Sequence, residues 1–165
     1  MKGIADTGFL VAFVSRNDRH HDWAASLAED QTEPLLTCES VLSETAFHLG
    51  SSAAALALIS QQLIELAFDC NKHIPQLAAL AKRYSDRNPD LADLCLIRMS
   101  ELYPHHKVIT TDREDFSVYR RNKREFIPLV WPPGKTDLVF APLVADSWAV
   151  YDNSGRAPRL LEKSP

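Results

Sequence analysis

Short apolar runs alternate with longer stretches of helical periodicity over roughly the first 130 residues of this 165-residue chain. The runs have the length and composition of buried strands, and the stretches between them repeat apolar residues every three to four positions. We expect strands over residues 2–5, 34–37, 63–67, 107–110 and 126–129. This alternation predicts an α/β fold of three layers, in which helices cover both faces of a mostly parallel sheet.

Helices are predicted in the segments that connect these strands. They are expected over residues 7–15, 20–30, 39–49, 52–62, 74–87, 90–103 and 113–121. Gly50 follows the third of them, in the position where glycine favours the end of a helix. Asp90 stands at the start of the sixth and suits its N-cap, with Asp93 in the first turn.

A Trp-Pro-Pro-Gly segment at residues 131–134 indicates a boundary near the end of the alternating pattern. We therefore expect one domain over residues 1–132 and a C-terminal extension over 133–165. The extension contains short β-like segments at 138–143, 147–151 and 159–162, with a turn at 152–155. It is too short to bury a core of its own, and the sequence leaves its role open.

Composition narrows the classes of function. The formal net charge is −4 and the pI is near 5.8, which gives no general attraction to nucleic acid. Bound metal ions can invert the local field of an acidic site, so nucleic acid is not excluded. Three widely spaced cysteines favour reduced thiols over a zinc ribbon or a disulfide framework. With no signal peptide and no membrane-spanning apolar run, we expect a cytoplasmic protein.

Four acidic residues fall where an α/β fold brings distant segments together. Asp6 and Asp112 each follow a predicted strand, and parallel α/β sheets bind ligands beyond the carboxyl ends of their strands. Asp93 lies in the first turn of a predicted helix, and Glu44 lies mid-helix, where we expect it to point inward. Close carboxylates repel unless cations neutralise them, and oxygen ligands favour Mg²⁺ or Mn²⁺. The set predicts metal-assisted hydrolysis of a phosphodiester.

The same acids lie in stretches that resemble the motifs of PIN-domain (PilT N-terminus) nucleases. These stretches are ADTGFL at 5–10, LSET at 42–45, LADLC at 91–95 and VITTDREDF at 108–116. The ending VYRR at 118–121, with Ile127-Pro128, resembles toxins of the virulence-associated protein C type. Order and spacing agree over residues 1–132, although Leu94 stands where the family often has alanine.

The resemblance implies a three-layer α/β/α PIN-like fold and a Mg²⁺- or Mn²⁺-dependent endoribonuclease, often the toxin of a toxin–antitoxin pair. It also implies a homodimer, a cognate antitoxin protein that covers the site, and an RNA substrate such as a tRNA or ribosomal RNA. The residues carried over as catalytic are Asp6, Glu44, Asp93 and Asp112, with Asp6, Asp93 and Asp112 as metal ligands. Asp90, Asp115 and Thr7 are carried over as accessory residues.

Residues outside the motifs are candidates for contact with RNA. A basic cluster is predicted to bind RNA phosphates, and it consists of Arg113, Arg120, Arg121, Lys123 and Arg124. A solvated surface run, or a seat for an acidic antitoxin segment, is an equally good interpretation of this cluster. Phe47 and Trp23 are interpreted as core or interface residues rather than base-stacking platforms.

Each acid also has a simple structural interpretation when it is taken singly. Asp6 and Asp90 suit helix N-caps, and Asp112 suits a turn after a strand. Glu44 suits a solvated position on a helix. Only the joint occurrence of the acids in family order favours the nuclease.

Two rival enzyme classes share part of the N-terminal motif. Aspartic proteases carry an Asp-Thr-Gly triplet such as residues 6–8, but they need strands on both sides of it, and a helix is predicted after this one. Haloacid-dehalogenase-like phosphatases need a second aspartate two residues after the first, where this chain has Gly8. The remaining alternative is a catalytically degenerate PIN fold that binds RNA or a partner.

Overall fold

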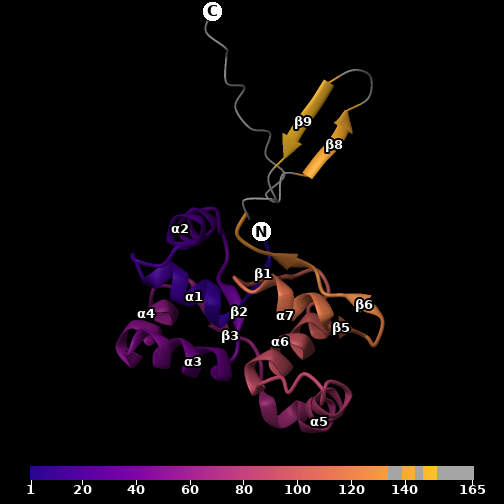
Figure 1. The fold of residues 1–165 in the computed structure, drawn as a ribbon. Helices are drawn as coiled ribbons and strands as arrows, with labels where there is room; N and C mark the ends of the chain where they lie inside the picture. The colour runs from indigo at the N-terminus through magenta and orange to yellow at the C-terminus, as the bar shows by residue number, and fades with distance from the viewer. Residues whose placement is uncertain (134–138, 144–146, 152–165) are drawn as a thin grey trace, which may run out of the picture.

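The computed structural model describes residues 1–133, 139–143 and 147–151 of the chain (Figure 1). Five strands form one sheet in the order β3-β2-β1-β4-β7, and every neighbouring pair runs parallel. These strands are β1 (Gly3–Ala5), β2 (Leu35–Thr37), β3 (Ile64–Leu66), β4 (Lys107–Ile109) and β7 (Leu129–Val130). The predicted α/β fold with a mostly parallel central sheet is therefore confirmed.

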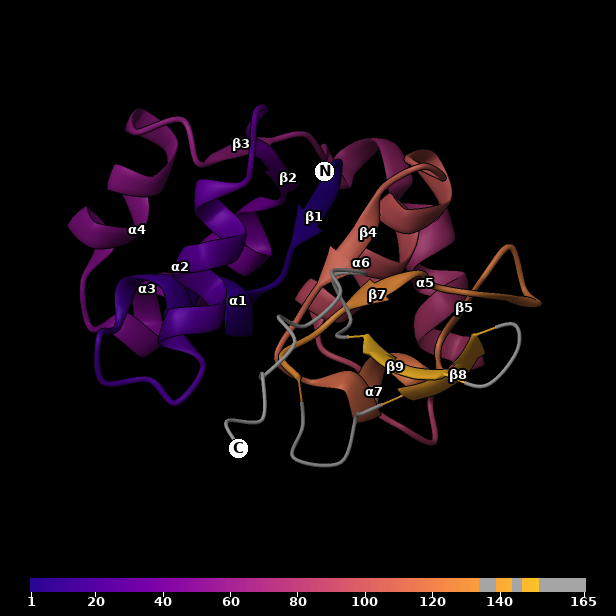
Figure 2. The ribbon, with the colours of Figure 1, turned by 90° about the horizontal axis from the view of Figure 1, so that it is seen from above.

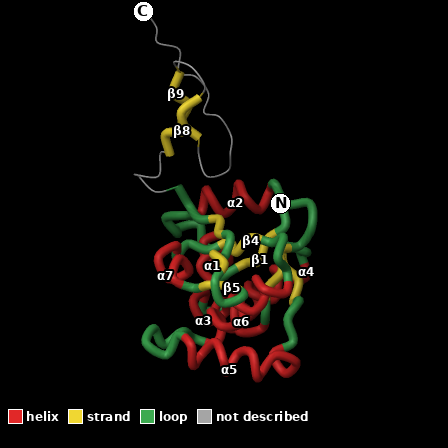
Figure 3. Tube along the Cα trace, turned by 90° about the vertical axis from the view of Figure 1, so that its right-hand side faces the viewer, coloured by secondary structure: helices red, strands yellow, loops and turns green. Residues whose placement is uncertain are grey.

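Helices flank this sheet. They are α1 (Thr7–Val14), α2 (His21–Glu29), α3 (Glu39–Leu49), α4 (Ser52–Ser60), the 3₁₀ helix η1 (Cys70–His73), α5 (Ile74–Arg83), α6 (Leu91–Leu102) and α7 (Arg113–Val118). Figure 3 shows α2 and α6 on opposite faces of the sheet, with α5 beyond α6. Helix α6 packs against β1 and β4, and α5 packs against α6. The helices thus form the two outer layers of the three-layer α/β fold.

The sheet is central because its strands are apolar on both faces. Ile4, Ala5, Val108 and Ile109 expose 0% of their surface. A strand covered by helices on both sides requires a continuous apolar run rather than an alternating one, and this is the pattern of β1 and β4. The core extends into the helices through large buried side chains such as Phe9, Leu10, Leu96 and Met99.

The order of the strands reverses at β1. From β1 the chain moves to β2 and β3, and it then returns through α5 and α6 to β4 on the other side of β1. Figure 2 shows β1 and β4 side by side, and the pairing continues past β1, since the amide of Asp6 donates to the carbonyl of Ile109 at 3.0 Å. Open α/β sheets bind ligands beyond the carboxyl ends of strands at such a reversal.

The segment after Asp112 differs from its prediction. The helix expected over 113–121 ends at Val118, and an antiparallel hairpin follows, with β5 (Arg120–Arg121) paired to β6 (Glu125–Phe126). The strand expected over 126–129 lies at β7 instead. Asn122 and Lys123 adopt positive φ angles of 48° and 72° at the hairpin tip, a backbone conformation that asparagine tolerates well. Helical periodicity over so short a stretch does not distinguish a helix from a tight hairpin.

Two further differences lie elsewhere in the chain. The helix predicted over 74–87 ends at Arg83, and the 3₁₀ helix η1 before it was not predicted.

In the C-terminal extension, β8 (Val139–Leu143) pairs antiparallel with β9 (Ser147–Tyr151), close to the expected segments. The β segment expected at 159–162 and the turn at 152–155 lie outside the described residues. None of the helices described is both long and apolar enough to cross a lipid bilayer.

Candidate active site

Asp6 follows directly after β1, and both of its carboxylate oxygens are held. Oδ1 accepts from the amide of Thr7 at 2.6 Å, which caps the N-terminus of α1. Oδ2 accepts from the hydroxyl of Thr110 at 2.6 Å, across the pair of strands β1 and β4. Thr110 also accepts a hydrogen bond from the amide of Asp112 at 2.9 Å. One buried threonine therefore joins the two acids that follow the neighbouring strands.

Glu44 reaches the same place from α3. The hydroxyl of Thr7 donates to Oε2 of Glu44 at 3.0 Å, over a separation of 37 residues. The first turn of α1 lies so close to the loop after β4 that a Cβ atom at position 8 would clash with the side chain of Thr111. A larger residue at position 8 would push α1 away from that loop. With its carboxylate bonded to Thr7, Glu44 is half-buried and points inward, as predicted from its helix position.

Asp93 and Asp90 come from the start of α6. Asp90 is the N-cap of this helix, and its Oδ1 accepts from the amide of Asp93 at 2.8 Å. Asp93 lies in the first turn, and its Oδ2 accepts from the hydroxyl of Tyr119 at 3.3 Å. Tyr119 is buried against Tyr84 and Phe116 in two edge-to-face ring contacts. Asp90 therefore caps α6, as predicted, and its side chain also lines the pocket described below.

Asp112 and Asp115 come from the start of α7. Asp112 caps this helix by accepting from the amide of Asp115 at 3.1 Å, and both side chains are exposed. Asp6, Asp90 and Asp112 therefore each cap a different helix, and α1, α6 and α7 all begin at the same place. The positive ends of these helix dipoles offset part of the repulsion among the acids.

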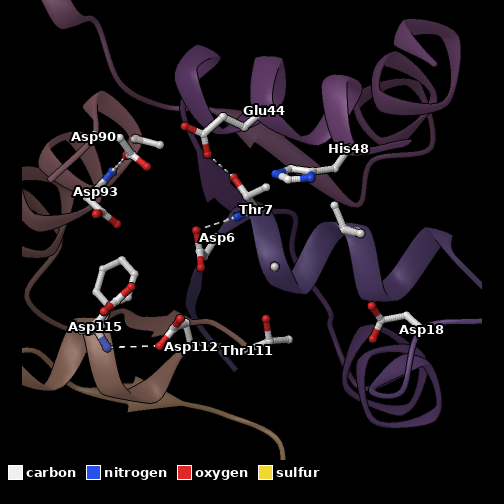
Figure 4. A pocket seen from close by; sticks show the side chains of 14 residues that line it. Asp6, Thr7, Asp18, Glu44, His48, Asp90, Asp93, Thr111, Asp112 and Asp115 are labelled. Atoms are coloured by element: carbon white, nitrogen blue, oxygen red, sulfur yellow. Dashed lines mark hydrogen bonds between the residues drawn. The ribbon is translucent and has the colours of Figure 1, made fainter. Parts of the chain in front are cut away.

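All of these acids line a single hollow of about 350 Å³ (Figure 4), which we call the acid pocket. Its lining consists of Asp6, Thr7, Gly8, Val11, Asp18, Glu44, His48, Asp90, Ala92, Asp93, Thr111, Asp112, Asp115 and Phe116. Every acid predicted for the site is present, together with Thr7. Sequence reasoning missed Asp18 and His48 in the lining, as well as Thr110 and Tyr119 behind it.

Several carboxyl groups in the pocket hold their protons more tightly than usual. Burial raises the pKa of Asp6 to about 6, although the hydrogen bond from Thr110 opposes the shift. Burial, with the charges of Asp90 and Asp6, raises the pKa of Asp93 to about 7. Burial also raises the pKa of Glu44, against the hydrogen bond from Thr7. Carboxyl groups with perturbed pKa values that gather in a hollow mark a functional site.

The donor chemistry of the pocket suits a hard divalent cation. Its polar lining consists of carboxylates and hydroxyls with one histidine, and it includes no lysine or arginine among the residues described. However, no three His, Cys, Asp or Glu side chains in those parts of the chain are arranged to hold one ion together. A magnesium ion keeps several waters and takes only one or two carboxylates directly. Asp6 and Asp93, the acids with the most strongly raised pKa values, fit that limited number of direct ligands.

The basic cluster lies outside the lining of the acid pocket. Arg121 donates to the carbonyl of Pro104 at 2.9 Å and pairs with Glu125 at 3.1 Å. The guanidinium of Arg120 lies 3.8 Å from the ring centroid of Phe126. Lys123 and Arg124 are exposed at the hairpin tip. A further member stacks on an aromatic ring, with Arg113 lying 4.3 Å from the ring centroid of Trp131.

The family model of the PIN domain matches residues 4–122, a range that covers more than half of the chain and includes every acid of the pocket. The chain belongs to the PIN domain family. Domains of this family are typically nucleases and generally use divalent metals.

Among solved structures, this PIN domain protein is similar to the toxin VapC20 of Mycobacterium tuberculosis, described as cleaving the sarcin–ricin loop. The TM-score is 0.56 at 20% sequence identity, and the match covers 67% of this chain and 90% of that one. At this identity the likeness supports the fold alone. No curated protein matches the sequence.

Proposed function

We propose that this PIN domain protein is a metal-dependent endoribonuclease that hydrolyses RNA phosphodiester bonds. The observation that carries the proposal is the convergence of Asp6, Glu44, Asp93 and Asp112 from four distant segments into one acid pocket. Acids that gather in one pocket whose described lining contains no lysine or arginine repel one another, which costs stability unless cations neutralise them. Evolution tolerates such a cost where the site performs chemistry.

Each acid then has a role in the proposed reaction. Asp6, Asp93 and Asp112 would hold Mg²⁺ or Mn²⁺, as the family pattern implies. When bound, the metal supplies a nucleophilic water and neutralises the phosphate. Glu44 orients that water or takes its proton, and the hydroxyl of Thr7 fixes the direction of the Glu44 carboxylate. Asp90 and Asp115 act as accessory acids at the edge of the pocket.

We also propose that the enzyme is the toxin of a toxin–antitoxin pair. The fold it shares with VapC20 supports this role, as does the resemblance of its motifs to toxins of that type. A homodimer, a cognate antitoxin that covers the acid pocket, and a tRNA or ribosomal RNA substrate follow from the same proposal. Residues 1–132 would carry the nuclease, and the extension from 133 onward has no assigned part in it.

The decisive experiment incubates the purified protein with total RNA, with Mg²⁺ or Mn²⁺ added and with EDTA. Cleavage is expected only with metal, and Asp6→Asn and Asp93→Asn should each reduce it at least about a hundredfold, which is within the usual effect of a metal ligand or catalytic acid. Asp22→Asn is the matched control, because this exposed aspartate lies on α2 outside the acid pocket. Cleavage that persists in EDTA, or full activity in both pocket variants, contradicts the proposal.

The toxin role has its own test. Expression of the protein should inhibit bacterial growth, Asp93→Asn should relieve the inhibition, and co-expression of a small neighbouring reading frame should also relieve it. Harmless expression of an enzyme that cleaves RNA in vitro would refute the toxin role and leave the nuclease intact.

A catalytically degenerate module is the second candidate. It is favoured by one observation, that no three acidic, histidine or cysteine side chains of the described residues are arranged to hold a common ion. Titration with Mg²⁺ followed by calorimetry separates the two candidates. A nuclease site binds the ion with an affinity that falls in Asp93→Asn, whereas a degenerate module shows no saturable binding.

A further inference from the structure

One edge of the acid pocket has no role in the proposed chemistry. It consists of His48, near the end of α3, and Phe47 is its neighbour in the chain, outside the lining. His48 lines the pocket beside Thr7 and lies one helical turn beyond Glu44, on the same side of the helix (Figure 4). It is the only basic side chain among the described residues that line the pocket. Its charge also acts on Glu44, whose pKa it lowers against the larger effect of burial.

Phe47 departs from the ordinary behaviour of its residue type. Its side chain is 82% exposed, so Phe47 is not a core residue, and of the two predicted alternatives only the interface residue is compatible with the structure. Its ring meets the imidazole of His48 edge to face, with the ring centroids 5.6 Å apart and the planes at 75°. The neighbouring imidazole therefore contacts the phenyl ring while most of that ring faces solvent. The open part of this ring offers a flat apolar face to a ligand that reaches His48 in the pocket.

We propose that Phe47 and His48 together bind one unpaired nucleotide of a single-stranded RNA next to the phosphate that is cleaved. Phe47 stacks on the nucleobase, and the imidazole of His48 donates a hydrogen bond to a phosphate oxygen. This inference rests on the proposed nuclease function, because it takes the acid pocket to be the place of cleavage. It adds two side chains that would contact an unpaired nucleotide beside the cleavage site.

The chemistry of both side chains fits this occupant. Every nucleobase has a π face, so stacking on Phe47 tolerates any sequence but requires a base that is not enclosed in a duplex. An imidazole ring carries at least one N–H whichever tautomer is present, so His48 can donate to phosphate without being charged.

A second phenylalanine is strongly exposed among the side chains that the structure describes, and it is less suited to stacking. Phe126 is 71% exposed, but the guanidinium of Arg120 lies over its ring at 3.8 Å and occupies one face. Phe126 also belongs to the β5–β6 hairpin, and neither residue lines the acid pocket. Phe47 does not line the pocket either, but its ring contacts His48, which does.

The test measures binding of fluorescein-labelled RNAs of about 12 nucleotides, a length within the range that one single-strand binding site covers, by fluorescence anisotropy with Ca²⁺ in place of Mg²⁺ to limit cleavage. The probes are a single strand of mixed sequence, the same strand with abasic sites, and its duplex. Phe47→Ala should weaken binding of the single strand about tenfold and leave the abasic strand unchanged within about twofold. Phe47→Trp should retain wild-type binding. Leu56→Ala is the matched control, because this 57% exposed leucine on α4 does not line the pocket.

His48 is tested on the same probes. His48→Ala should weaken binding of the single strand and the abasic strand alike, because a phosphate contact does not depend on the base. His48→Gln, which keeps an N–H donor, should recover part of the affinity. Circular dichroism melting of each variant checks that the fold is retained.

The outcomes separate this inference from the proposed function. Equal binding of the single strand by wild type and Phe47→Ala overturns the inference, even if Asp6→Asn still abolishes cleavage. Wild-type binding that is no better for the single strand than for the abasic strand overturns it as well. Base-dependent binding through Phe47 in a protein that never cleaves RNA would refute the proposed nuclease and support Phe47 only as a contact for a nucleobase.

Discussion

The hydroxyl of Thr110 donates to Oδ2 of Asp6 at 2.6 Å, although 104 residues separate the two along the chain. The threonine is fully buried and also accepts from the amide of Asp112. Thr110 therefore holds one carboxylate oxygen of Asp6, the more buried acid, and the backbone amide of Asp112, the exposed one. No motif that marks acids would select this residue, yet it connects the ends of β1 and β4.

Replacing Thr110 with valine removes this donor and leaves the oxygen of Asp6 and the amide of Asp112 without their partner. We expect Thr110→Val to lower the free energy of unfolding by about 1–3 kcal/mol and to reduce RNA cleavage about tenfold or more. Thr110→Ser should keep most of both. Thr37→Val is the control, since this buried threonine of β2 donates to the carbonyl of Ala5 outside the pocket. Chemical denaturation and initial rates measure the two effects, and wild-type cleavage by Thr110→Val would contradict the prediction.

The raised pKa values predict how pH acts on the metal-free protein. The folded protein holds the proton of Asp6 up to a pKa of about 6, against a usual value of 3.8, so this group favours folding most at low pH. Through this group, the free energy of unfolding falls by at most about 3 kcal/mol as the pH rises from about 4 to above about 6. Asp6→Asn should therefore gain stability relative to wild type between about pH 4.5 and pH 8. Parallel melting curves for the two proteins across this range would rule the effect out.

The same pKa values set a lower pH limit for metal binding, and therefore for the proposed RNA cleavage. Metal ligation requires ionised carboxylates, and the pKa of Asp93 is raised to about 7 in the metal-free protein. Cleavage at limiting Mg²⁺ should increase from about pH 6 to pH 8, and higher Mg²⁺ should shift this increase to lower pH. A profile that does not change with the metal concentration would show that Asp93 does not couple to the ion.

Tyr119 offers a test of how Asp93 is oriented. Tyr119→Phe removes only the hydroxyl that donates to Asp93, so its ring contacts with Tyr84 and Phe116 remain. We expect the Mg²⁺ concentration for half-maximal activity to change about threefold or more, with little change in Tm. Tyr103→Phe is the matched control, because its hydroxyl donates to the carbonyl of Ala67 away from the acid pocket. A similar change in both variants would mean that the effect is general.

Three members of the basic cluster, one bonded within the fold and two exposed, should behave differently when they are replaced. Arg121 is bonded to Pro104 and Glu125 within the fold, so Arg121→Ala should lower the free energy of unfolding by about 1–2 kcal/mol. Lys123 and Arg124 are exposed, so replacing both with alanine should leave Tm unchanged. If they bind phosphate, this double variant should weaken RNA binding and make it less sensitive to salt, by about one unit of slope for each phosphate that is no longer neutralised. Unchanged affinity at every salt concentration would exclude them.

Much of the fold and of the site could be predicted from the sequence because the signals involved are local. The apolar runs of β1 and β4 and the capping aspartates Asp6 and Asp90 follow from residues that lie near them in the chain. The same local logic failed after Val118, where the hairpin depends on Arg120 over Phe126 and on the pair Arg121–Glu125. Those contacts join two short strands and leave no periodicity that a sequence pattern could reveal.

The sequence by itself determined the alternation of the sheet strands with the helices between them, and it identified the acids of the pocket. Only the tertiary structure decided which side chains complete the site, because parallel pairing of β1 with β4 brings Thr110 to Asp6, and helix packing brings Tyr119 to Asp93. It also decided that Phe47 faces solvent while its neighbour His48 faces the pocket. Burial and electrostatic coupling depend on distance in space, so the raised pKa values of Asp6 and Asp93 arise only once the chain is folded.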